Sequence, residues 1–130
     1  MDTNHKPALI LLVDDEADIL SVYRTKLEKV GFRVITASDG AQAVRMATEQ
    51  HPDLTLMDMK MPVMDGITAQ MKLKENPETA NLKVVFLTAF SDPMGPEIDE
   101  KSAKENGALD FLRKGIGLDE FVEKVRGYLA

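Results

Sequence analysis

The sequence predicts an α/β fold, a doubly wound, five-stranded parallel sheet with helices on both faces. Three observations predict it: five apolar runs have the length of strands, stretches with helical spacing separate them, and the runs are apolar on both faces. Strands of that kind form a parallel sheet that helices cover on both sides, with right-handed crossovers.

The strands and helices alternate along the chain in five units. The strands are expected at Ala8–Val13, Phe32–Thr36, Leu54–Met57, Leu82–Leu87 and Leu109–Leu112. The apolar stripes of the helices are Ile19, Tyr23, Leu27 and Val30, then Val44 and Ala47, then Ile67 and Met71, and finally Leu118, Phe121, Val122, Val125 and Leu129.

Turn residues mark the ends of these helices. Gly31 closes the first helix, Ser38 or Asp39 caps the second, and Asp65 caps the third. The segment Ser91–Asn106 fits less well, because it holds two prolines and a glycine before a helix with little apolar material. We expect that fourth helix, which starts near Pro96, to be weakly anchored.

Composition narrows the class of protein. A chain of 130 residues with 44% apolar residues matches one domain, residues 1–130, with a flexible N-terminus at residues 1–7. The net charge of -6 argues against direct contact with nucleic acid. Without cysteine the chain has no disulfide or thiolate metal site. No apolar run is long enough to span a bilayer and no secretory pattern is present, which indicates a cytoplasmic protein without membrane insertion.

Charged and hydroxyl side chains follow the predicted strands. Asp14 and Asp15 follow the first, Asp58 the third, Thr88 the fourth and Lys114 the fifth. The functional crevice of a doubly wound sheet lies at the carboxyl ends of its strands, so these side chains should converge. Clustered carboxylates stay ionised together only beside a cation, and oxygen ligands favour Mg²⁺, with Mn²⁺ as an alternative.

Taken singly, these residues have simpler interpretations. An acidic pair after a strand is commonly a helix cap, and a lone aspartate in a loop is commonly a turn residue. The two histidines, His5 and His51, have no partner of metal-ligand spacing, and the eight methionines suit core and loop packing. Only the joint arrangement of the five polar residues favours phosphoryl transfer to a carboxylate.

Four stretches carry a resemblance to a known family: LILLVDDEADI, PDLTLMDMKMPVMDG, VVFLTA and GALDFLRKG. In order and spacing they resemble the receiver domain of two-component response regulators, which has a flavodoxin-like fold. The resemblance implies that Asp58 is the phosphoacceptor and that the chain is a signalling protein rather than an enzyme. The implied donor is a sensor histidine kinase or a histidine phosphotransfer protein.

The resemblance also implies a metal site. Asp15, Asp58 and the backbone carbonyl of Lys60 match the direct Mg²⁺ ligands of the family, and Asp14 acts through water.

A conformational switch is implied by the same match. Thr88 and Phe111 correspond to the switch pair, and Lys114 corresponds to the lysine that contacts the phosphoryl group. Phosphorylation would change the face formed by the fourth helix, fifth strand and fifth helix, which would bind a downstream target protein.

The chain departs from the family pattern in three places. Gly115 stands where the family usually has a cis-proline, and a trans bond there would aim Lys114 differently. The interval between Thr88 and Phe111 is longer than usual. Phe90 and Lys60 occupy positions that border the acyl phosphate, so both are expected to modulate its lifetime, with Phe90 hindering the attacking water.

Several alternatives remain at this point. The chain is either a stand-alone receiver, acting as a relay intermediate or on a target, or part of a larger protein. A phosphatase of the haloacid dehalogenase type also uses an aspartate after a strand, but it has a second aspartate where this chain has Lys60. A receiver that serves only as a scaffold is a third possibility. A nucleotide-binding module is disfavoured because no glycine-rich loop follows the first strand.

Overall fold

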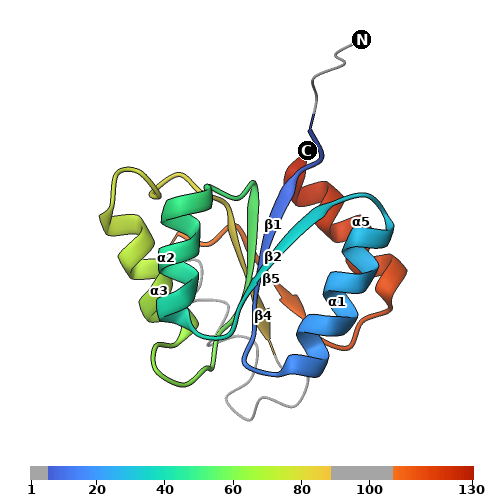
Figure 1. Ribbon diagram of the computed structural model, residues 1–130, viewed down its shortest axis with the longest axis horizontal. Coiled ribbons are helices and arrows are strands. Elements are labelled where there is room, and N and C mark those ends of the chain that lie inside the picture. Colours follow the sequence, from blue (N-terminus) through green and yellow to red (C-terminus); the bar gives the residue numbers. More distant parts are fainter. Residues whose placement is uncertain (1–5, 89–106) are drawn as a thin grey trace.

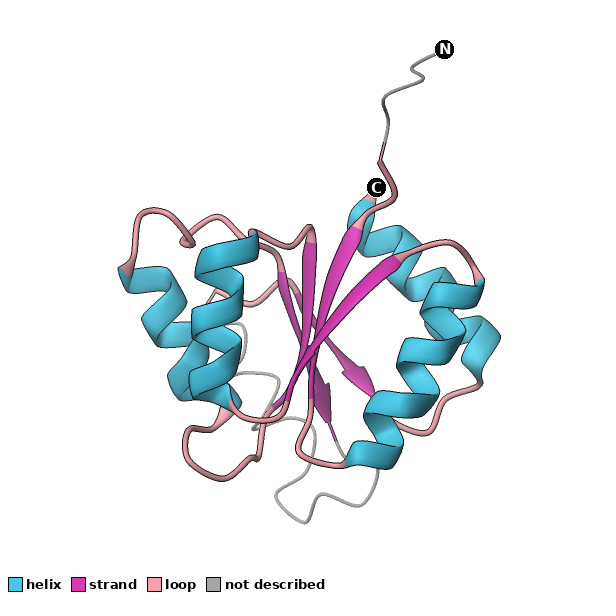
Figure 2. Ribbon diagram, in the orientation of Figure 1, coloured by secondary structure: helices cyan, strands magenta, loops and turns pink. Residues whose placement is uncertain are grey.

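The sheet contains five parallel strands in the order β2-β1-β3-β4-β5. The structure is a computed structural model that describes residues 6–88 and 107–130. The strands are β1 (Leu9–Val13), β2 (Arg33–Ala37), β3 (Leu54–Asp58), β4 (Val84–Thr88) and β5 (Asp110–Arg113). Figure 2 shows them as the central layer of the molecule, and the predicted doubly wound sheet is confirmed.

Helices cover both faces of this sheet. Figure 1 shows α1 (Ala17–Lys29) and α5 (Leu118–Leu129) on one side, with α2 (Gly40–Gln50) and α3 (Gly66–Glu75) on the other. Each layer has its own apolar core. Along β1, Ile10 and Leu12 pack toward α1 and α5, whereas Leu11 and Val13 pack toward α2 and α3. The strand is therefore apolar at every position, as the sequence pattern predicted.

Three predicted helix ends are confirmed by their hydrogen bonds. Gly31, at a φ of 104°, follows α1 and donates its N–H to the carbonyl of Glu28, while Phe32 donates to that of Leu27. The Asp39 carboxylate accepts from the Gln42 N–H and caps α2. In the same way, the Asp65 carboxylate accepts from the Thr68 N–H and caps α3.

The stripe predicted for α3 is wrong at Met71, which is 48% exposed. Ile67 is partly buried and packs against the same core as Ala69 and Leu73, and Gln70 is buried as well. Gly66 sets this face, because a side chain there would lie 2.4 Å from the carbonyl oxygen of Asp58. Positions three, four and seven residues beyond Gly66 therefore turn inward.

The predicted strand limits differ from the observed ones by one or two residues. β1, β2 and β5 each begin one residue later than predicted, and Leu82 and Lys83 precede β4 instead of belonging to it. The fourth predicted helix, Phe90 and His5 lie outside the described residues. Within residues 6–88 and 107–130, no helix is both long and apolar enough to cross a bilayer.

Candidate functional site

The predicted convergence of polar side chains at one edge of the sheet is confirmed. Asp58 and Thr88 are the last residues of their strands, and Lys114 directly follows β5. The Lys114 N–H donates to the Thr88 carbonyl over 2.9 Å, which ties the ends of β4 and β5 together. A cavity of about 200 Å³ opens at this edge, and its lining comprises Asp15, Glu16, Asp58, Met59, Lys60, Leu87, Thr88 and Lys114.

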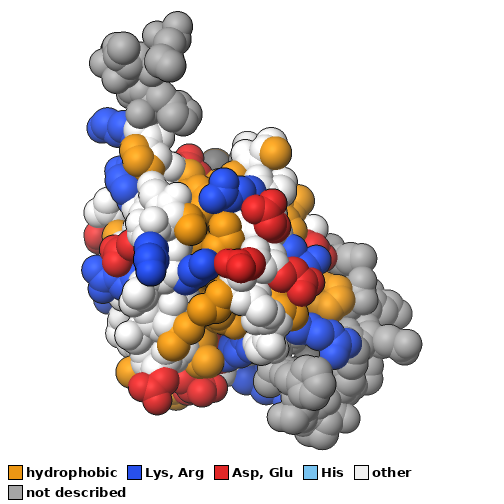
Figure 3. All heavy atoms as spheres, turned by 90° about the vertical axis from the view of Figure 1, so that its right-hand side faces the viewer, with side chains coloured by type: hydrophobic (Ala, Val, Ile, Leu, Met, Phe, Trp, Pro, Cys, Tyr) orange, Lys and Arg blue, Asp and Glu red, His pale blue; other side chains and the backbone are white. Residues whose placement is uncertain are grey.

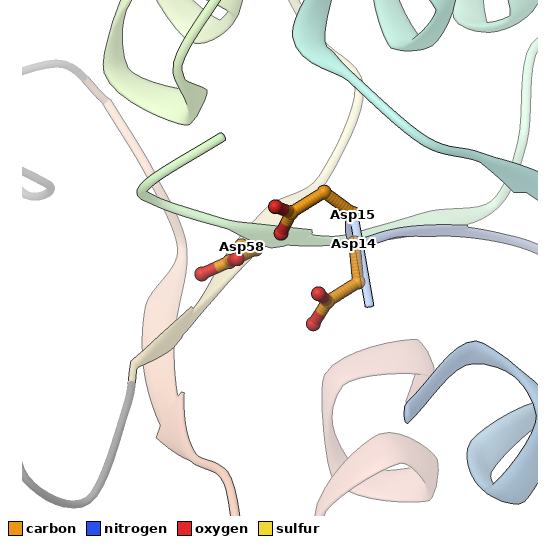
Figure 4. Close-up of side chains that lie close together, drawn as sticks. All are labelled: Asp14, Asp15 and Asp58. Atoms are coloured by element: carbon orange, nitrogen blue, oxygen red, sulfur yellow. The ribbon is translucent and has the colours of Figure 1, made fainter. Parts of the chain in front are cut away.

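Three carboxylates meet beside this cavity. Asp14, Asp15 and Asp58 each offer an oxygen, and these oxygens all lie within 4.8 Å of one another. Figure 4 shows that Asp14 and Asp15 follow the end of β1, while Asp58 comes from the neighbouring β3. Asp14 and Asp58 are buried, whereas Asp15 is exposed and lines the cavity.

Lys114 neutralises part of this charge. Its Nζ lies 2.7 Å from Oδ2 of Asp14 and 3.3 Å from Oδ2 of Asp58, and its side chain is only 11% exposed. The Lys114–Gly115 peptide is trans, and Gly115 has a φ of 91°. The lysine still reaches both carboxylates, so the glycine does not turn it away from the site.

Burial and neighbouring charges shift the pKa values of both Asp58 and Lys114. Desolvation is the main cause that raises the pKa of Asp58 to about 6; Lys114 opposes this rise, and the neighbouring charge of Asp14 adds to it. Burial also lowers the pKa of Lys114, but its contacts with Asp14 and Asp58 outweigh burial and raise that pKa overall. One lysine among three carboxylates leaves negative charge that suits a divalent cation held by oxygen ligands.

The loop between β3 and α3 holds Lys60 at the cavity. The Gly66 N–H donates to the Met59 carbonyl and the Gly40 N–H donates to the Met64 carbonyl, each over 2.9 Å. Neither glycine has room for a Cβ, because a backbone carbonyl lies 2.4 Å from that position. These contacts clamp the loop, which explains how Val63 keeps a strained φ of 69° with its side chain 85% exposed.

The predicted switch residues occupy neighbouring strands. Thr88 is buried and lines the cavity, and it pairs in register with Arg113 of β5. Phe111 is partly buried and packs toward α2 and α3. Phe90, the other predicted modulating residue, lies outside the described residues, and Lys60 lines the cavity with its N–H 3.5 Å from Oδ1 of Asp58.

One residue that lines the cavity was not predicted from the sequence. Glu16 lines the cavity, and its Oε1 lies 3.9 Å from Nζ of Lys114. The signal was present, because an acidic residue directly follows the Asp14–Asp15 pair, but a third carboxylate at a helix start resembles an ordinary surface charge.

Comparisons with known proteins agree with this site. The profile of the response regulator receiver domain matches residues 10–126. Transcriptional regulatory protein PrrA of Mycobacterium tuberculosis is 38% identical over an alignment of 130 residues that covers 99% of this chain and 53% of PrrA. The chain thus spans about half the length of that relative. Sporulation initiation phosphotransferase F of Bacillus subtilis is 36% identical over 121 residues, 92% of either chain.

A solved structure extends the comparison to the fold. The receiver domain of the sensor histidine kinase PA1611 from Pseudomonas aeruginosa, with a magnesium ion coordinated in its active-site cleft, is 29% identical. It superposes with a TM-score of 0.83 over 95% of this chain and 98% of that one. The profile match, the strand order and the carboxylate cluster place this chain in the response regulator receiver domain family, the phosphoacceptors of two-component and phosphorelay signalling.

Proposed function

We propose that Asp58 is the residue that accepts the phosphoryl group, from a phosphohistidine of a sensor histidine kinase or a phosphotransfer protein. The observation that carries this assignment is the position of Asp58 at the end of β3, inside the cavity and 3.3 Å from Lys114. Asp14 is less suited, because its side chain is fully buried and already holds Lys114 at 2.7 Å. The second aspartate that a haloacid dehalogenase phosphatase needs is replaced by Lys60.

The donor set fits a magnesium ion, and Mn²⁺ shares the same preference for oxygen ligands. Asp15, Asp58 and the backbone carbonyl of Lys60 would hold the ion directly, with Asp14 acting through water. The ion supplies positive charge against the oxygens of the transferring phosphoryl group. The magnesium ion in the related Pseudomonas receiver supports this assignment.

The transfer itself needs little covalent chemistry from the protein. An oxygen of Asp58 forms a bond to phosphorus as the bond from phosphorus to the donor's imidazole nitrogen breaks, and that nitrogen keeps the electron pair. Lys114, fixed by Asp14, holds a positive charge beside the phosphoryl oxygens throughout. Because β3 fixes the carboxylate, positioning contributes most of the rate.

The phosphorylated state would then change the surface. The Thr88 hydroxyl donates a hydrogen bond to a phosphoryl oxygen, and Phe111 turns inward to fill the space that Thr88 leaves. The affected face consists of β5, α5 and the predicted fourth helix, and it would bind a downstream target protein. We further propose that residues 1–130 form one receiver domain that acts in the cytoplasm.

Intact-mass spectrometry tests the assignment of Asp58. Incubation with Mg²⁺ and acetyl phosphate should add one phosphoryl group to the wild type and none to Asp58→Asn. Omitting Mg²⁺, or adding a chelator, should slow formation of the adduct at least about tenfold, since the charge of Lys114 alone is then left to oppose that of the phosphoryl group. An adduct that forms equally in Asp58→Asn would refute the assignment.

A further inference from the structure

Glu16 breaks a local rule of helix formation. It is the N-cap of α1, yet its side chain makes no capping hydrogen bond. Glutamate is not among the residues favoured there, which are Ser, Thr, Asp and Asn. The backbone is held by other means, because the Glu16 N–H donates to Oδ1 of Asp14 over 2.9 Å and the Glu16 carbonyl accepts from Leu20. The side chain therefore contributes little to the start of the helix.

The side chain instead lies at the mouth of the functional cavity. It lines the cavity together with Asp58 and Lys114, and it is 64% exposed. Its Oε1 lies 3.9 Å from Nζ of Lys114. Because the glutamate is exposed to solvent, this ion pair is weak. Figure 3 shows acidic side chains gathered at the lower end of the face formed by α1 and α5, where α1 begins.

The net charge around the cavity depends on Glu16. Four carboxylates surround the cavity, those of Asp14, Asp15, Glu16 and Asp58, and the ammonium of Lys114 lies among them. A divalent cation would reduce the negative charge of that set without cancelling it. Removing Glu16 would make the loaded site less negative, so that it repels anions less strongly.

We propose that Glu16 selects the phosphodonor by charge. Its carboxylate disfavours dianionic acyl phosphates and tolerates donors with a phosphorus–nitrogen bond, whose protonated nitrogen offsets one phosphate charge. With acetyl phosphate, the bond from phosphorus to the acyl oxygen breaks and acetate leaves. With phosphoramidate, the phosphorus–nitrogen bond breaks and ammonia leaves with the protons that it already carries. Asp58 gains the phosphoryl group in both cases, so the inference rests on the proposed function.

The expected size of the effect follows from the Coulomb energy. A unit charge about 7 Å from the donor in water corresponds to about a threefold change in rate per unit of donor charge. A dianion experiences this repulsion twice as strongly as a monoanion. Added salt screens it, since the Debye length falls to about 3 Å at about 1 M salt.

The test compares two donors on one protein. Initial rates of adduct formation are measured by intact mass with acetyl phosphate and with phosphoramidate, at a Mg²⁺ concentration that calorimetry shows to saturate each variant. Glu16→Gln should raise the ratio of the acetyl phosphate rate to the phosphoramidate rate about threefold at low salt, and the increase should vanish at about 1 M salt. Glu16→Asp keeps the charge and should keep the wild-type ratio.

Glu49→Gln is the matched control. Glu49 is an exposed glutamate in the last turn of α2 and does not line the cavity, so its loss changes the net charge equally. A ratio that is the same in Glu16→Gln as in Glu49→Gln, or an increase that persists at high salt, would overturn the role of Glu16. Failure of both donors to modify Asp58 in the wild type would instead overturn the proposed function itself.

Discussion

The burial of Asp58 lowers the stability of the fold and at the same time suits the carboxylate to act as a nucleophile. Its carboxylate is buried at the end of an apolar strand, and burial raises its pKa to about 6, well above the ordinary value of an aspartate. The unfolded chain therefore ionises at lower pH than the folded protein, and the charged form opposes folding. The same burial keeps the carboxylate rigid and poorly hydrated, which suits a nucleophile.

The cost of burying Asp58 should appear in how the free energy of unfolding depends on pH. Between about pH 4 and pH 6 only the unfolded state of the metal-free wild type is ionised at Asp58, so the contribution of Asp58 to stability falls across this window and the loss is complete above it. Asp58→Asn removes the charge and should raise the free energy of unfolding by about 1–3 kcal/mol at pH 8, with no gain near pH 4. Urea unfolding at several pH values measures it. A constant difference between the two proteins at every pH would contradict the stated cause.

Several residue-level predictions came from position alone. The sequence could place five residues together because each lies at or just beyond the carboxyl end of a strand in a parallel sheet: Asp14, Asp15, Asp58, Thr88 and Lys114. The distances could not be predicted, since the contact of Lys114 with Asp14 depends on how the β5–α5 connection runs. Glu16 was missed for a similar reason, because its partner Lys114 lies 98 residues further along the chain and the two come close only in the folded protein.

At the scale of elements, glycine contacts place the β3–α3 loop. Gly66 begins α3 against the carbonyl of Asp58, and Gly40 begins α2 against that of Met64. The sequence predicted α3 but only part of its inward face, because Ile67 packs against the core whereas Met71 of the same apolar stripe is exposed by the packing at Gly66. Strand limits were accurate to one or two residues, since apolar runs extend into turns.

A pair of glycine substitutions tests this close packing. Gly66→Ala should lower the free energy of unfolding by more than about 2 kcal/mol, because its Cβ would lie 2.4 Å from a backbone oxygen that cannot move without shifting Asp58. Gly127→Ala is the control, since Gly127 lies in α5 with open space around its Cβ position. That change should raise stability by up to about 1 kcal/mol through helix propensity. Thermal and urea unfolding distinguish the two, and a stabilised Gly66→Ala would contradict the packing.

At the scale of the whole molecule, a rigid sheet separates two cores and carries the reactive groups at one edge. Side chains of α1 contact those of α5. The rings of Tyr23 and Phe121 stack with centroids 4.3 Å apart, and Lys26 contacts Asp119 over 2.9 Å. The C-terminal end of α5 is tied to the sheet, because the Tyr128 hydroxyl donates to Asp110 and Lys83 donates to the Tyr128 carbonyl. These hydrogen bonds hold the C-terminal end of α5 against the sheet.

The architecture was more predictable than the response to phosphorylation. Alternating strands and helices specify the doubly wound sheet and the edge that holds the site, because both follow from periodicity and handedness. The predicted fourth helix lies outside the described residues, so its part in the output face stays a prediction. Gly115 was expected to matter for the aim of Lys114, and the observed contacts show that the lysine reaches Asp58 from a trans peptide.

The most direct measurement is the chemical identity of residue 58 after phosphorylation. Borohydride reduces an aspartyl phosphate to homoserine, which peptide mass spectrometry can locate in the chain. After treatment with acetyl phosphate and Mg²⁺, homoserine should appear at position 58 and at no other aspartate, and Lys114→Ala should reduce its yield at least about tenfold because the lysine charge no longer helps the ion to oppose the phosphoryl charge. Homoserine at position 14 or 15, or its absence from position 58, would contradict the assignment of Asp58 as the phosphoacceptor.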